Sequence, residues 1–239
     1  MFTAGSFTDL LIRALLLVPA LLIAIPVHEL GHAVAAYFLG DRSVRYFGYL
    51  KPDPRRYLDT YGTIAVFLAL VGWGRRVPVQ SNRISTRGQK VIYELGGPAA
   101  NLVVGIVLGF VLRGLLALGV PFSFTPGPGL LLAAVYAIVF LNLSVFAFNL
   151  LPIPGLDGWN IIEALLRGRN ARFFYDVAMR QREIWVGCVI AIVVFQFLFG
   201  ISLLSIVMTP FFEPASLISL NACVDYRIPN LAFLFPCLL

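Results

Sequence analysis

Two histidines, His28 and His32, lie four residues apart with Glu29 directly after the first, and the chain has no other histidine. On a helix, residues four positions apart share one face, so both imidazoles can bind the same metal ion. Glu29 stands where its carboxylate can reach a water molecule on that metal. This H-E-x-x-H spacing is the one that zinc peptidases use, with the glutamate as the acid/base.

The surroundings of this motif are unusual for a soluble enzyme. Between Arg13 and Asp41, Glu29 is the only charged side chain. Of the 239 residues, 59% are hydrophobic and only 13% are charged. Apolar stretches of about twenty residues span bilayers as helices. A zinc site at His28 would therefore lie inside a lipid bilayer.

A catalytic zinc ion takes three protein ligands and keeps one open position, so a third ligand is needed. Four acids lie in charged loops that water can reach: Asp41, Asp53, Asp59 and Glu94. Asp157 instead ends a run without charges, after a bend at Pro152 and Pro154, where a lone carboxylate needs a polar partner. A metal ion would be such a partner. The alternative is that Asp157 caps a helix that begins near Trp159.

The hydropathy pattern predicts an all-α polytopic membrane protein with one domain, residues 1–239. Its core covers residues 20–168, followed by a C-terminal helix over 184–208 and a tail over 209–239, whose prolines argue against another span. Four stretches are long enough to cross completely: residues 10–39, 98–118, 130–150 and 184–208. Residues 60–74 are apolar but short, so we expect them to re-enter without crossing. Small β-strands are expected on the cytoplasmic side, within 44–50 and 76–80, as edges for an extended substrate.

The distribution of basic residues predicts the orientation in the membrane. Residues 42–56, 75–90 and 167–182 carry five Lys or Arg each, whereas 119–129 carry none. Basic loops stay in the cytoplasm, so four spans place both termini on the outer side. The His28 site then lies nearer the cytoplasmic face, about 18 Å along the helix from Gly40. The same rule explains the net charge of +6 without a nucleic-acid partner.

The motifs together resemble those of the site-2 protease family of intramembrane zinc metalloproteases. The resemblance rests on His28-Glu29-Leu30-Gly31-His32 and on Asn149-x-x-Pro152-x-Pro154-x-Leu156-Asp157-Gly158 downstream. Residues 96–101 resemble the family's Gly-Pro-x-x-Asn element. Residues 58–63 resemble the Asp-Pro-x-Gly-Thr element of its shorter members, with Thr60 in place of the proline. Residues 73–79 resemble its Trp-x-x-Pro-Val-Pro-Val strand, but Arg76 replaces the first proline. No PDZ or CBS module is visible in the sequence.

The resemblance implies a single Zn²⁺ held by His28, His32 and Asp157, with Glu29 as the catalytic acid/base. It also implies that Asn149 lies near the substrate carbonyl, and that the substrate is a single-span membrane protein in the lipid bilayer.

Other interpretations of these residues remain open at this stage. The histidines could be hydrogen-bonded in a helix bundle, and Asn149 or Asn101 could join neighbouring helices. A metal transporter could use the same four side chains, although no internal repeat is visible. A catalytically inactive scaffold is a third possibility, but a purely structural metal site has no use for Glu29.

Overall fold

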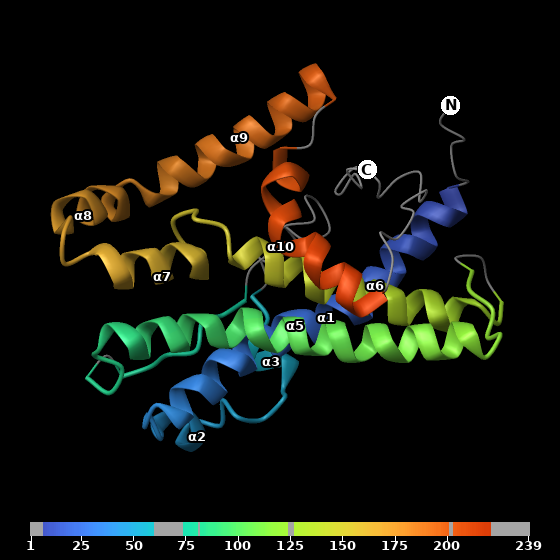
Figure 1. Ribbon diagram of the computed structural model, residues 1–239, viewed down its shortest axis with the longest axis horizontal. Coiled ribbons are helices and arrows are strands. Elements are labelled where there is room, and N and C mark those ends of the chain that lie inside the picture. The colour runs from blue at the N-terminus through green and yellow to red at the C-terminus, as the bar shows by residue number, and fades with distance from the viewer. Residues whose placement is uncertain (1–6, 60–73, 81, 124–126, 201–202, 221–239) are drawn as a thin grey trace.

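The computed structural model describes residues 7–59, 74–80, 82–123, 127–200 and 203–220, and these parts are helices joined by short connections (Figure 1). The helices of the described parts are α1 (Phe7–Phe38), α2 (Ser43–Tyr46), α3 (Pro54–Tyr57), α5 (Arg87–Ala117), α6 (Leu130–Asn149), α7 (Asp157–Leu166), α8 (Ala171–Met179), α9 (Gln181–Phe199) and α10 (Leu203–Leu220).

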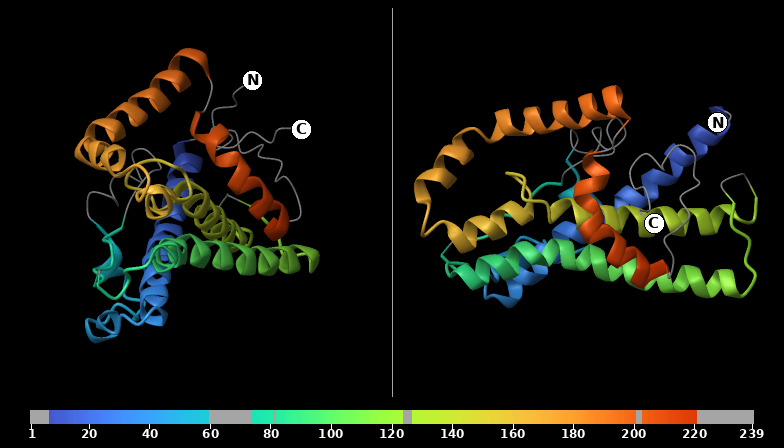
Figure 2. Two further views of the ribbon diagram at one scale, coloured as in Figure 1. Left: turned by 60° about the vertical axis from the view of Figure 1, so that its left-hand side comes forward. Right: turned by 45° about the horizontal axis from the view of Figure 1, so that its top comes forward.

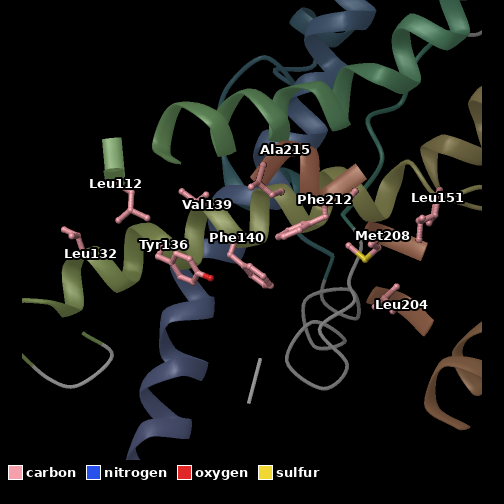
Figure 3. Close-up of a cluster of buried hydrophobic side chains, with 13 residues drawn as sticks. Leu112, Leu132, Tyr136, Val139, Phe140, Leu151, Leu204, Met208, Phe212 and Ala215 are labelled. Atoms are coloured by element: carbon pink, nitrogen blue, oxygen red, sulfur yellow. The ribbon is translucent and has the colours of Figure 1, made fainter. Parts of the chain in front are cut away.

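Three long helices, α1, α5 and α6, pack against one another and form the centre of the molecule. Figures 1 and 2 show α5 and α6 side by side, with α1 crossing them and with α7, α8 and α9 extending as an arm from one end. Helix α10 lies across α5 and α6 and contacts both. A cluster of buried hydrophobic side chains joins these three helices, and it includes Leu112, Val139, Phe140, Met208 and Phe212 (Figure 3).

Two glycines allow α1 and α5 to approach closely. A methyl group on Gly31 would lie 2.2 Å from the carbonyl oxygen of Gly96, and one on Gly96 would lie 2.7 Å from the carbonyl oxygen of Gly31. Such distances are shorter than real side chains tolerate, so only glycine fits at this crossing. The crossing presses the part of α1 that carries His28 and His32 against α5.

Within the described residues, five helices are long and apolar enough to cross a membrane: Leu15–Phe38, Arg87–Ala117, Leu130–Asn149, Gln181–Phe199 and Leu203–Leu220. The expected all-α polytopic fold is therefore confirmed. The expected span over 184–208 was wrong, because the chain forms α9, then Gly200 with a left-handed φ of 66°, and then α10.

The interpretation of residues 209–239 as a tail without a span was also wrong for its first part. Helix α10 continues through residues 209–220 and contains Pro210 and Pro214. Membrane helices tolerate internal prolines because neighbouring helices and side chains satisfy the freed backbone groups.

The predicted cytoplasmic strands are not supported in the described part of the chain. Within residues 44–50, Val44 and Tyr46 belong to α2, and the Tyr49 N–H donates to the Val44 carbonyl at 2.8 Å, as in a helical turn. Residues 76–80 belong to no helix or strand, and the β-type contact nearby is an isolated bridge between Leu58 and Gly74. The predicted re-entrant segment 60–74 lies outside the described residues except for Gly74.

Asp41 connects the end of α1 to the segment 76–80. One carboxylate oxygen accepts hydrogen bonds from the backbone N–H and the hydroxyl of Ser43, at 3.0 and 2.5 Å, and the other accepts from the Gln80 N–H at 2.8 Å. Burial alone would raise the pKa of Asp41, but the hydrogen bonds from Ser43 and Gln80 outweigh it and hold the pKa below its ordinary value.

The close approach of α1 and α5 predicts that Gly96→Ala destabilises the fold. The new methyl group meets backbone that cannot move aside, so we expect a loss of about 1–3 kcal/mol. Gly88→Ala, on the same helix but with no neighbour within 4 Å of the added carbon, is the matched control and should lose nothing. Thermal unfolding of both variants in detergent measures the difference, and equal stabilities would contradict the close packing.

The hydrogen bonds of Asp41 predict that Asp41→Asn lowers stability at pH 7 by about 1–3 kcal/mol, because the amide nitrogen cannot accept from a backbone N–H. The folded protein lowers this pKa. The carboxylate therefore contributes fully above its ordinary value of about 3.9, and its contribution disappears as the pH falls through the lowered value. Melting temperatures of wild type and variant should differ at pH 7 and converge in acid; a constant difference would contradict this account.

Candidate metal centre

The structure brings His28, His32 and Asp157 together, although the aspartate lies 125 positions after the second histidine in the chain. The two Nε2 atoms are 3.2 Å apart, and the Asp157 Oδ2 atom lies 3.1 Å from the first and 3.2 Å from the second. Three ligand atoms of a tetrahedral zinc ion with bonds of 2.0–2.1 Å are separated by about 3.3 Å. The three atoms thus have the spacing that Zn²⁺ requires.

The hydrogen bonds of the imidazoles leave both Nε2 atoms free to bind a metal. His32 Nδ1 lies 2.8 Å from the carbonyl oxygen of Tyr93, which can only accept, so the ring proton is on Nδ1. His28 Nδ1 lies 2.8 Å from Asn101 Oδ1. Metal-binding histidines are oriented by hydrogen bonds of this kind.

The orientation of Asn101 follows from its other contacts. Its amide nitrogen donates to the Ala24 carbonyl at 2.9 Å and to Asn142 Oδ1 at 2.8 Å. Asn142 in turn donates to the Ile138 carbonyl of its own helix at 2.8 Å. The amide oxygen of Asn101 must therefore face His28, which donates to it.

These assignments leave three acceptor atoms facing one another without hydrogens between them. The exposed fractions of His28, His32 and Asp157 are 7%, 4% and 3%, and Asp157 Oδ2 has no hydrogen-bond partner among the described residues. Lone pairs at such distances repel one another unless a cation lies between them. The donor set and its geometry fit Zn²⁺.

Gly97 on α5 provides the room that the imidazoles need. A methyl group at this position would lie 2.3 Å from His32 Nε2 and 2.8 Å from His28 Nε2. A larger residue here would occupy the space in front of the ligand atoms, so the glycine keeps the metal position open.

Asp157 is the first residue of α7, and its carboxylate does not cap that helix. The N-cap is Leu156, and no side chain makes a capping hydrogen bond there. Gly158 permits the turn, because a methyl group on it would lie 2.3 Å from the Leu150 carbonyl oxygen. The chain after α6 thus turns the Asp157 carboxylate toward the histidines, and the capping alternative does not describe this structure.

Glu29 is buried beside the histidines, and its Oε2 atom has no hydrogen-bond partner among the described residues. It lines a cavity of about 1040 Å³ together with the three candidate ligands and Asn149. Gln181 and Trp185, at the start of α9, lie on another side of this cavity. A carboxylate oxygen without a partner, next to a metal position and in the lining of a cavity, is suited to proton transfer.

Asn149 lines the same cavity from the C-terminal end of α6, and its amide nitrogen donates to the Val145 carbonyl at 3.0 Å.

The acids that the sequence offered as other ligands have different partners. Asp41 binds Ser43 and Gln80, Asp53 caps α3, and Glu94 accepts a hydrogen bond from Asn160 at 3.1 Å.

Asn142 is the residue of this site that sequence reasoning missed. A buried asparagine in the middle of an otherwise apolar membrane helix is the signal that could have identified it. The sequence does not indicate that it faces Asn101, so its connection to His28 emerges only from the packing of α6 against α5.

This connection predicts that Asn142→Ala weakens zinc binding. Without Asn142 Oδ1 the Asn101 amide loses one of the contacts that orient it, and we expect roughly tenfold lower zinc affinity. Ser144→Ala is the matched control, because the Ser144 hydroxyl donates only to the Phe140 carbonyl of the same helix in the described structure. Competition with a chromophoric chelator measures both affinities. Equal affinities for the two variants would contradict the role of Asn142.

Comparison with known proteins agrees with the site. Residues 125–196, which include Asp157, match the model of peptidase family M50. The "Putative zinc metalloprotease YwhC" of Bacillus subtilis is 37% identical over 154 residues, which cover 63% of this chain and 68% of the relative. The "Putative zinc metalloprotease Rip2" of Mycobacterium tuberculosis is 36% identical over 157 residues, which cover 63% of this chain and 57% of the relative.

A second protein of the latter name, from Mycolicibacterium smegmatis, is 33% identical over 165 residues, or 66% of this chain and 60% of that relative. The chain thus spans less than two thirds of the length of the mycobacterial relatives. No solved structure matches the chain closely. The metal-binding geometry and these relatives together show that the chain belongs to peptidase family M50, the site-2 protease family of zinc metalloproteases.

Proposed function

We propose that this protein is an intramembrane protease that hydrolyses a peptide bond within or near the membrane segment of a single-span membrane protein. The observation that carries the proposal is the position of the metal centre. His28, Glu29 and His32 lie on α1, a candidate membrane span, and they are buried against α5, a second one. The cavity in front of them is also lined by Val145 of α6, a third. A protease with its centre at this depth is suited to substrates that lie in the bilayer.

Each residue of the site has its own role in the proposed hydrolysis. His28, His32 and Asp157 hold Zn²⁺, which when bound polarises the scissile carbonyl and makes a water molecule acidic enough to serve as the nucleophile. Glu29 Oε2 accepts the proton of this water as its oxygen bonds to the carbonyl carbon. The same carboxyl group then returns the proton to the amide nitrogen as the carbon–nitrogen bond breaks.

Asn149 takes the role of a donor to the oxyanion in this proposal. An amide nitrogen carries two N–H groups, and one of them suffices for the hydrogen bond to Val145. The other N–H donates a hydrogen bond to the carbonyl oxygen of the substrate, on which negative charge develops during attack. Its position in the cavity lining supports this assignment.

The orientation in this proposal follows from charge. The basic loops over 42–56, 75–90 and 167–182 lie in the cytoplasm. The metal centre is then closer to the cytoplasmic face, since His28 is about 15 Å of helical rise from Phe38, the last residue of α1. The N-terminus lies on the outer side. If α10 also crosses the bilayer, its C-terminal end lies in the cytoplasm rather than outside.

The proposal predicts that a reconstituted enzyme cleaves a single-span substrate in liposomes, and that a zinc chelator abolishes the cleavage. Glu29→Gln should lower the rate by about 10²–10⁴-fold, as expected for loss of an acid/base, while the protein still binds zinc. Glu183→Gln is the matched control, because Glu183 is exposed on α9 and does not line the cavity. Gel analysis of the cleaved substrate measures the rates.

Two outcomes would contradict the proposal. Cleavage that survives both the chelator and Glu29→Gln would show that this site does not carry the activity. Metal flux into the liposomes without cleavage would favour a transporter.

A further inference from the structure

Arg76, in the segment 76–80 before α5, contacts the residues that carry the third candidate ligand. Its Nη2 atom donates to the Gly155 carbonyl at 3.1 Å and lies 3.6 Å from Asp157 Oδ1. We infer that Arg76 is a positioning residue that holds the Asp157 carboxylate, and the bend before it, in the orientation that binds zinc. This inference rests on the proposed function only in taking the three side chains as zinc ligands.

The two oxygens of Asp157 have separate partners. Oδ2 faces the Nε2 atoms of both histidines, whereas Oδ1 faces the Arg76 guanidinium. A carboxylate that is free to rotate would exchange these oxygens or turn both away from the histidines. A cation on one side therefore selects the rotamer in which a single oxygen points to the metal position.

The contact with Gly155 fixes the backbone that carries this ligand. Gly155 has a left-handed φ of 102° and follows the second proline of the bend. Its carbonyl oxygen accepts a hydrogen bond from the same nitrogen that faces Asp157. One nitrogen of the guanidinium thus contacts both the backbone carbonyl of the bend and the carboxylate of the ligand, and so connects the two.

The backbone of Arg76 is itself held on both sides. Before it, the Arg75 N–H donates to the Tyr57 carbonyl at 2.7 Å, and Gly74 forms the bridge to Leu58. After it, Val77 is buried, and the Gln80 N–H donates to Asp41 at the end of α1. Arg76 thus connects the region that follows the histidine helix to the segment that supplies the third ligand.

Zinc affinity of the full-length protein in detergent tests the inference. Arg76→Gln should bind zinc about 10–100-fold more weakly than wild type, the usual effect of losing a residue that orients a ligand. Arg76→Lys should fall between the two. Arg75→Gln is the matched control: it removes the same charge one residue away, its side chain makes no contact described in the structure, and it should stay within twofold of wild type.

A second measurement distinguishes positioning from a general effect of charge or folding. If Arg76 acts through Asp157, then Arg76→Gln should cause no further loss of zinc affinity in a protein that already carries Asp157→Asn. Thermal unfolding without metal should give the same midpoint for Arg76→Gln and Arg75→Gln.

The inference is overturned if wild type binds one zinc ion and the Arg76→Gln and Arg75→Gln variants bind it equally well. Additive losses in the double variant would also overturn it, since they would place the effect of Arg76 elsewhere. Wild-type protein that binds no zinc at all would refute the proposed function itself, and this inference with it.

Discussion

The structure depends on keeping three electron-rich atoms within 3.2 Å of one another in a place that water hardly reaches. The Nε2 atoms of His28 and His32 and the Oδ2 atom of Asp157 would repel one another there without a cation. The fold therefore needs supports strong enough to hold these side chains in place. Asn101 and Asn142, both buried in the described part of the helical core, are among these supports.

The hydrogen-bonding supports of the histidines come from α5 and α6. Asn142 of α6 orients Asn101 of α5, which accepts from His28, and the Tyr93 carbonyl of α5 accepts from His32. In a membrane a side chain amide without a partner is costly, so each asparagine also fixes the relative rotation of the helices it joins. Gly97 leaves the ligand atoms accessible. The same residues thus determine both how the helices pack and how the metal is bound.

Sequence patterns predicted the parts of this site that depend on local spacing. His28, Glu29 and His32 are recognisable because a helix brings positions i and i+4 together, and Asp157 stands out as a charge after a long apolar run. Asn142 was not recognised, because its partner lies 41 residues away and the sequence does not reveal which face of α6 meets α5.

The errors about the fold have a similar origin. Hydropathy continues through Gly200, so the separation of α9 from α10 was invisible without backbone geometry. A strand was expected within 44–50, but its backbone forms hydrogen bonds within helical turns instead, such as that from the Tyr49 N–H to the Val44 carbonyl. Because the ligands meet only when α1, α5 and the start of α7 are in place, zinc binding and folding must be linked. A mutation in any helix contact behind the ligands should then act on metal affinity as well as on stability.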